Sequence, residues 1–123
     1  MQIYAYDYNF INFGTRKQFK RSFKTCAYCG CEFTPQNRKT IDHLDARVNG
    51  GGNEITNKIV VCEICNRDKS DMGIKPYIDR HPYVEEYIRQ SVNEHAGQIY
   101  DGIDWSEGFK EHLTSELGRD IFA

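Results

Sequence analysis

The sequence predicts an α+β fold, in which a small metal-organised module lies between an N-terminal extended and basic segment and a C-terminal helical part. Three observations lead to this prediction. Two C-x2-C pairs bracket the module, short β-prone runs lie between the pairs, and apolar residues recur at helical spacing after residue 76. A chain of 123 residues has the length of one domain. We therefore expect residues 1–25, 26–72 and 76–123 to share a single core.

The N-terminal segment combines aromatic and basic residues. Its opening alternation of aromatic and smaller or polar residues is typical of a strand or an extended arm, whose rings pack in the core or stack on bases: Tyr4, Tyr6, Tyr8 and Phe10. The next stretch, TRKQFKRSFK, predicts a short helix capped by Thr15 with Phe19 and Phe23 facing inward. Its basic residues face outward, where they can lie along phosphates: Arg16, Lys17, Lys20, Arg21 and Lys24.

Two further helices are predicted in the C-terminal part. The first begins at Pro82 and ends at Gly97. The second begins at Asp104, which resembles a capping box together with Glu107, and ends before Gly118. Its i, i+4 apolar stripe is expected to be core: Trp105, Phe109, Leu113 and Leu117.

The net charge of −2 hides an asymmetry between the two ends of the chain. Residues 1–75 hold twelve Lys and Arg against eight Asp and Glu, a balance of +4, and residues 76–123 hold four against ten, a balance of −6. A basic front half suits a polyanionic partner, although ordinary solvated surface explains the same charges. The longest aliphatic run, residues 59–61, is far shorter than the roughly 20 residues of a membrane span, and the first residues have no signal-peptide pattern. We expect a soluble cytoplasmic protein with no membrane partner.

Four of the five cysteines form two C-x2-C pairs, Cys26 with Cys29 and Cys62 with Cys65, and 32 residues separate the pairs. Zinc prefers four ligands in a tetrahedron, and each C-x2-C turn delivers two thiolates to one edge. In a reducing compartment such pairs bind metal more often than they form disulfides, so we expect a structural zinc site. Cys31 is left over and is expected to pack as a small buried hydrophobe.

Between the pairs, polar side chains stand beside two β-prone runs, residues 39–42 and 58–61. Asp42 and His43 are adjacent at the end of the first run, and Asn66 directly follows the second C-x2-C. A neutral imidazole can take a proton from water near pH 7, and Asp and Asn oxygens are the hard ligands that Mg²⁺ prefers. Adjacent side chains of a strand point to opposite faces. Asp42 and His43 can therefore converge on one phosphate only if the strand ends or bends there. This predicts a bend at Leu44.

The same stretch resembles the signature of the HNH endonucleases, which consists of an Asp-His or His-His pair, a glycine-bearing loop, an Asn, and a His or Asn just beyond a C-x2-C. The matching residues are Asp42 and His43, the glycines at 50–52, Asn57, and CEICN at 62–66 followed by Lys69. The resemblance covers residues 26 to about 72. It departs from the commoner pattern at Ala46, where many members have Pro, and at Lys58, where Leu is usual.

The resemblance implies a ββα-metal, or His-Me finger, module that hydrolyses DNA phosphodiester bonds and leaves 5′-phosphate and 3′-hydroxyl ends. In this family His43 would be the general base, Asp42 and Asn66 would hold one catalytic Mg²⁺ or Mn²⁺, and Asn57 would hold the loop around the base. The zinc site would fix the start of the helix that presents Asn66.

The expected partner is DNA, either double-stranded or branched, and a homodimer would serve the cleavage of both strands. Basic residues around the motif are the candidates for phosphate contacts: Arg67, Lys69, Arg38, Lys39 and Arg47. Phage-type resolving enzymes share the CxxCN junction, as do homing, restriction and packaging-associated members of the family.

Two other functions remain open. A zinc-stapled nucleic-acid-binding module that does not cut needs the basic surface and the clamp but has no use for Asp42, His43 and Asn66 together. A protein-interaction domain would use the acidic helices of residues 76–123 for a partner or for dimerisation. The histidines outside the module are expected to be ordinary surface or core residues: His81, His95 and His112.

Overall fold

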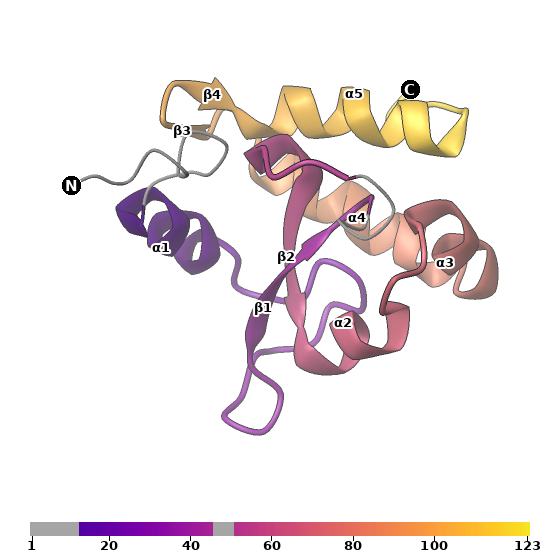
Figure 1. Cartoon of the computed structure of the whole chain (residues 1–123), viewed down its shortest axis with the longest axis horizontal. Coiled ribbons are helices and arrows are strands. Elements are labelled where there is room, and N and C mark those ends of the chain that lie inside the picture. Colours follow the sequence, from indigo (N-terminus) through magenta and orange to yellow (C-terminus); the bar gives the residue numbers. More distant parts are fainter. Residues whose placement is uncertain (1–12, 46–50) are drawn as a thin grey trace.

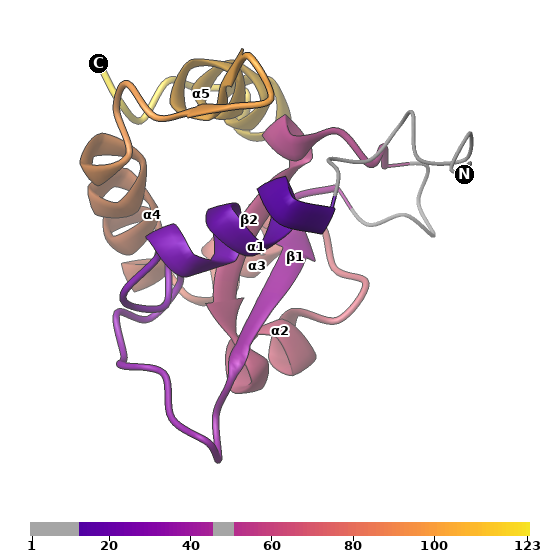
Figure 2. The same ribbon diagram turned by 90° about the vertical axis from the view of Figure 1, so that its left-hand side faces the viewer.

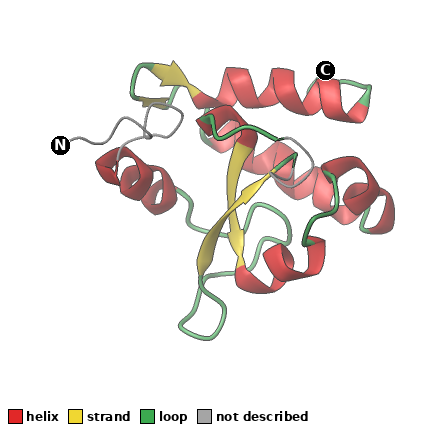
Figure 3. Cartoon of the chain, in the orientation of Figure 1, coloured by secondary structure: helices red, strands yellow, loops and turns green. Residues whose placement is uncertain are grey.

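The computed structural model describes residues 13–45 and 51–123, so the N-terminal aromatic row, Ala46 and Arg47 lie outside the described residues. The elements follow in the order α1 (Phe13–Ser22), β1 (Lys39–His43), the short 3-10 helix η3 (Ile55–Asn57), β2 (Lys58–Cys62), α2 (Glu63–Lys69), α3 (Ile74–Arg80), α4 (Tyr83–Glu94), β3 (Ile99–Tyr100), β4 (Ile103–Asp104) and α5 (Trp105–Leu117). Helices surround a central hairpin of β1 and β2 (Figures 1 and 3), which confirms the α+β class. None of the helices in the described ranges is long and apolar enough to cross a membrane.

The central hairpin carries the residues of interest. β1 and β2 pair antiparallel, with Lys39 opposite Cys62 and His43 opposite Lys58. Every residue of β2 is buried, and the indole nitrogen of Trp105 donates to the Lys58 carbonyl at 2.9 Å. The expectation of a strand at each β-prone run is confirmed, and α5 holds one end of the hairpin through Trp105.

α1 packs on this core through its aromatic face. Phe19 and Phe23 are buried, and their ring centroids lie 5.6 and 5.5 Å from that of Trp105. The predicted cap at Thr15 is wrong, because the helix already begins at Phe13. The Thr15 hydroxyl instead donates to an Asp101 carboxylate oxygen at 2.9 Å, a contact across 86 residues that ties α1 to the β3–β4 turn.

The C-terminal helices follow their predicted stripes. Asp104 caps α5 by accepting from the Glu107 amide at 3.2 Å, the helix ends at Gly118 with φ of 73°, and all four residues of the apolar stripe are buried. The helix predicted from Pro82 is α4, whose buried face is Val84, Ile88, Ser91 and Val92. α3 was not predicted from the sequence. It is a helix of only seven residues, too short for a clear apolar period, and it has Pro76 in its first turn. A proline is tolerated there, since the first amides of a helix have no partner within it.

Candidate metal centre and nuclease site

A thiol cluster joins the two C-x2-C turns. The sulfur atoms of Cys26, Cys29, Cys62 and Cys65 all lie within 4.8 Å of one another, and no other group of three or more His, Cys, Asp or Glu ligand atoms converges in the described part of the chain. Zn–S bonds of about 2.3 Å in a tetrahedron place neighbouring sulfurs about 3.8 Å apart. The cluster is thus close to the size that zinc requires, and the predicted positions of the four cysteines relative to one another are confirmed.

Backbone amides of the two turns point at the sulfurs. Cys26 Sγ accepts from the Tyr28 and Cys62 amides, each at 3.3 Å, and Cys62 Sγ accepts from the Cys65 amide at 3.5 Å. A hydrogen bond from the Cys65 thiol is the largest of the effects that lower the pKa of Cys26 to about 5, and the amides add to it. The Cys65 thiol itself has a raised pKa, first because of that bond and then because of burial. Charge at Cys26 is therefore favoured before any ion binds, as a thiolate ligand requires.

The fifth cysteine lies beside this cluster. Cys31 is half-buried, and its sulfur accepts a weak bond from the Asn37 amide at 3.8 Å. Burial is the first cause of its raised pKa. Cys31 packs against the core as expected of a small hydrophobe, although it is only partly buried and its sulfur also has a polar neighbour in Asn37.

The cysteine turn also sets the start of α2. Cys62 is the N-cap, and Glu63, the first residue of the helix, pairs with Arg38 through both backbone and side chain. The Arg38 guanidinium and amide lower the pKa of Glu63 to about 2, so the pair stays charged over the whole neutral range. Arg38 remains 71% exposed at its side chain but already has a bidentate carboxylate partner.

Asp42 of β1 faces α2 and is almost fully buried. Its Oδ2 atom accepts from the Tyr28 hydroxyl at 2.7 Å and forms an ion pair with Lys69 Nζ at 3.0 Å. The same ammonium donates to the His43 carbonyl at 2.9 Å. Burial and the charge of Asp42 raise the pKa of Tyr28, so the phenol stays a donor. The interpretation of Lys69 as a surface phosphate contact is wrong, because its side chain is 0% exposed and bonded inside the hairpin–α2 interface.

Asn66 meets the same strand face one helical turn earlier. Its Nδ2 atom donates to Thr40 Oγ1 at 2.9 Å, and the Thr40 hydroxyl donates to the Val61 carbonyl at 2.9 Å. A pocket of about 240 Å³ opens here, lined by Thr40, Glu63, Asn66 and Arg67. Arg67 is exposed, as expected of a phosphate contact, and Lys39 is half-buried with its ammonium 3.0 Å from the Lys20 carbonyl.

His43 stands on the opposite face of β1 from Asp42. Its Nε2 atom lies 3.3 Å from Asn53 Oδ1, and the side chain is half-buried. The chain bends at Leu44 directly after the strand, as predicted, with the Leu44 amide donating to the Asn57 carbonyl at 2.9 Å. The structure therefore places Asp42 and Asn66 in the interface between β1 and α2, where they bond different partners, whereas the imidazole of His43 lies on the other face of β1, beside Asn53.

Asn57 holds that loop. It is fully buried, its Nδ2 atom donates to the Asp45 and Gly52 carbonyls at 3.1 and 2.8 Å, and its Oδ1 accepts from the Asp45 amide at 3.1 Å. The Glu54 carboxylate lies over Gly52, in the space that a Cβ atom at this position would occupy. The side chain of Asn57 thus joins both ends of the segment that follows His43.

Several contacts of the site have no signal in the sequence. Tyr28, Thr40 and Asn53 bond to Asp42, Asn66 and His43, yet none of the three stands at a position of the HNH signature. The histidines outside the module have separate places. His95 is stacked on Phe23 at 4.0 Å, His81 lies 3.4 Å from Asp68, and His112 is half-buried on α5.

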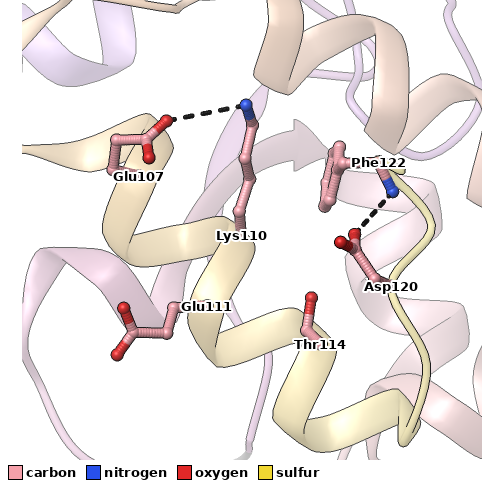
Figure 4. Close-up of a pocket in the computed structure, with 6 residues that line it drawn as sticks. All are labelled: Glu107, Lys110, Glu111, Thr114, Asp120 and Phe122. Carbon is pink, nitrogen blue, oxygen red and sulfur yellow. Dashed lines mark hydrogen bonds and ion pairs between the residues drawn. The ribbon is translucent and has the colours of Figure 1, made fainter.

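A second pocket lies away from these residues, between α5 and the C-terminal segment (Figure 4). It has a volume of about 390 Å³, and a pair of charged residues, Glu107 and Lys110, stands at one end with their charged atoms 3.6 Å apart. Lys110 also lies over the Phe122 ring at 5.5 Å from its centroid. The carboxylates of this pocket do not converge on one point as the cysteine sulfurs do.

Comparisons with known proteins agree with the motif. Residues 26–72 match the family model described as HNH endonuclease. Over 108 residues the chain is 19% identical to an uncharacterized protein of Acanthamoeba polyphaga mimivirus, in an alignment that covers 87% of this chain and 19% of the viral protein. The chain thus spans about a fifth of that protein's length. No solved structure matches the chain significantly.

Proposed function

From the HNH match of residues 26–72, we propose that this chain is a divalent-metal-dependent endonuclease that hydrolyses DNA. The observation that carries the proposal is the link made by Lys69, whose ammonium bonds the Asp42 carboxylate and the His43 carbonyl at 3.0 and 2.9 Å. One buried group thus fixes the two adjacent residues that the motif assigns to metal binding and to base catalysis. Such fixation is what a preorganised site needs.

Asp42 and Asn66 are the residues that would hold the catalytic ion. Within the described part of the chain, the contacts of Asp42 fall on Oδ2 and that of Asn66 is made by Nδ2, which leaves an Oδ1 atom on each for a cation. Two protein oxygens with water and phosphate in the remaining positions are a typical environment for Mg²⁺. A bound Mg²⁺ or Mn²⁺ would neutralise charge that develops on the phosphoryl and leaving oxygens.

His43 is proposed as the general base. A neutral imidazole takes a proton from the attacking water, a contribution of roughly 10² to 10⁴ in rate. Asn53 Oδ1, 3.3 Å from Nε2, would orient the ring, and Asn57 would hold the loop that carries Asn53. Exposed Arg67 in the pocket beside Asn66 would bind a phosphate oxygen.

Zinc in the thiol cluster would position the catalytic half of the site. Cys65 immediately precedes Asn66 in α2, and Cys62 caps the same helix. An ion that joins Cys62 and Cys65 to Cys26 and Cys29 would therefore fix the rotation of α2 and, with it, the direction of Asn66.

The test is nicking of supercoiled plasmid in Mg²⁺ or Mn²⁺ by the zinc-loaded chain. We expect His43→Ala to lower the nicking rate at least 100-fold, and His81→Ala, a matched change at a half-buried histidine paired with Asp68, to leave it unchanged. Equal rates for the wild-type chain and His43→Ala would overturn the mechanism.

A zinc-stapled DNA-binding module without activity is the second candidate, because the Lys69 ammonium that positions Asp42 also offsets the charge of its carboxylate. The carboxylate charge is already neutralised by an ammonium 3.0 Å away, which weakens its attraction for a cation. Titration calorimetry with Mn²⁺ separates the two: saturable binding that Asp42→Asn abolishes supports the nuclease, and DNA binding that is indifferent to divalent ions, without product, supports the binding module.

A further inference from the structure

Four basic side chains lie near the C-terminal end of α1 and the first residue of β1. We name Lys20, Arg21, Lys24 and Lys39 the α1 basic surface. Lys39 Nζ donates to the Lys20 carbonyl at 3.0 Å, and Lys24 Nζ lies 3.5 Å from the Arg21 carbonyl. Three of the four residues precede the segment that matches the HNH family, so the motif does not account for them.

The charges of this surface repel one another. Burial is the first cause of the lowered pKa of Lys39, and the charges of Lys24, Lys20 and Arg21 are the next three. None of the four cations forms an ion pair with a carboxylate among residues 13–45 and 51–123. Several basic side chains elsewhere in the described residues are paired, such as Lys75 with Asp79 and Arg119 with Glu85.

Helix capping explains only part of the arrangement. The last carbonyls of α1 accept from Lys39 and Lys24, and a helix C-terminus carries roughly half a negative charge. Four positive charges against about half a negative one leave an excess above +3. Each ammonium has three donors, and Lys24 and Lys39 use one each on a carbonyl, so donors remain for phosphate oxygens.

The surface lies on the same side of β1 as His43. Side chains alternate along a strand, so Lys39 and His43 share one face, whereas Thr40 and Asp42 face α2. Figure 2 shows α1 crossing in front of the hairpin, and the bond from Lys39 Nζ to the Lys20 carbonyl joins this helix to the strand. Four residues of strand span about 13 Å, which corresponds to about four phosphates of one DNA strand measured along the duplex axis.

We propose that the α1 basic surface binds the phosphate backbone of duplex DNA a few nucleotides from the bond that is cut. This inference rests on the proposed function, because the position of the cut is set by His43. The surface adds affinity without reading sequence, since phosphate contacts position a duplex and carry no base information. It also explains how a chain with a net charge of −2 can bind a polyanion: the acidic helices lie in the other half of the chain.

The salt dependence of binding tests the inference. A fluorescent 30-base-pair duplex is titrated with the full zinc-loaded chain carrying His43→Ala, in Mg²⁺ and increasing NaCl. Each phosphate contact contributes about 0.9 to the magnitude of the slope of log K against log salt. Added to this background, Lys20→Gln with Lys24→Gln should therefore lower that magnitude by about 1.8 and weaken binding roughly 60-fold at 0.1 M salt. The matched control, Lys75→Gln with Lys110→Gln, removes the same charge from residues paired with Asp79 and Glu107 and should leave the slope unchanged.

Two results would overturn the inference. In the first, the salt slope of the variant with Lys20→Gln and Lys24→Gln equals that of the control variant. In the second, this variant binds DNA more weakly but its salt slope does not change. Cleavage of plasmid by the otherwise wild-type chain is scored separately. If the chain cleaves plasmid but the salt slope does not respond to Lys20→Gln with Lys24→Gln, only the proposal for the α1 basic surface is refuted. If these changes reduce the slope but the chain does not cleave, the surface is supported and the proposed nuclease is refuted.

Discussion

The buried ion pair of Lys69 with Asp42 gives the sharpest prediction about the stability of the site. In Lys69→Met the ammonium is lost from a side chain that is 0% exposed, and the Asp42 side chain, 8% exposed, keeps only the Tyr28 hydroxyl as a donor. The His43 carbonyl loses its side-chain donor as well. Removing one partner of a buried pair costs about 3–5 kcal/mol, a large part of the 5–15 kcal/mol that holds a typical domain together.

Urea unfolding of the zinc-loaded protein, without Mg²⁺, measures this cost. A loss of 3–5 kcal/mol corresponds to a fall in Tm of roughly 12–20 °C for a domain of this size. Lys75→Met is the matched control, because Lys75 forms an exposed i, i+4 pair with Asp79 that contributes little. In the double variant Lys69→Met with Asp42→Asn the buried charge is gone, so the combined loss should be smaller than the sum of the single losses. If Lys69→Met destabilises the protein no more than Lys75→Met does, the ion pair does not hold the hairpin to α2 and the reasoning fails.

Three further outcomes are expected. Asn57→Ala removes three hydrogen bonds to the backbone of the loop after His43 and should cost about 2–3 kcal/mol in urea unfolding, with faster exchange of the Asp45 amide; unchanged exchange would show that the side chain does not hold the loop. Cys26→Ser should abolish stoichiometric zinc binding in a chromogenic chelator assay whereas Cys31→Ser retains it, and equal losses would contradict the set of four ligands. Because the pKa of Glu63 is lowered in the fold, its stabilising effect should be fully present above the unfolded value of 4.5 and be lost as the pH falls through about 2; a carbon NMR titration of its carboxyl near 4.5 would contradict the pairing with Arg38.

Much of the module follows from local spacing in the sequence. A C-x2-C turn brings two sulfurs together wherever it occurs, so two such turns predicted the thiol cluster. The β-prone runs predicted both strands, the alternation of side chains predicted the bend at Leu44, and the i, i+4 stripe from Trp105 predicted the buried face of α5. These features depend on backbone periods that a few neighbouring residues determine.

Only the tertiary structure decided which side chains from distant segments contact these faces of the helices and strands. Spacing places Lys69 one turn after Asn66 on α2, but only the packing of α2 against β1 turns a predicted surface cation into the buried partner of Asp42. Thr15 likewise caps no helix and instead bonds Asp101, 86 residues away, because α1 lies beside the β3–β4 turn. The sequence by itself determined which chemical groups this protein carries and on which faces of its strands and helices they stand. The tertiary structure decided which of those groups meet, because contacts between distant segments depend on how the faces pack and not on their spacing along the chain.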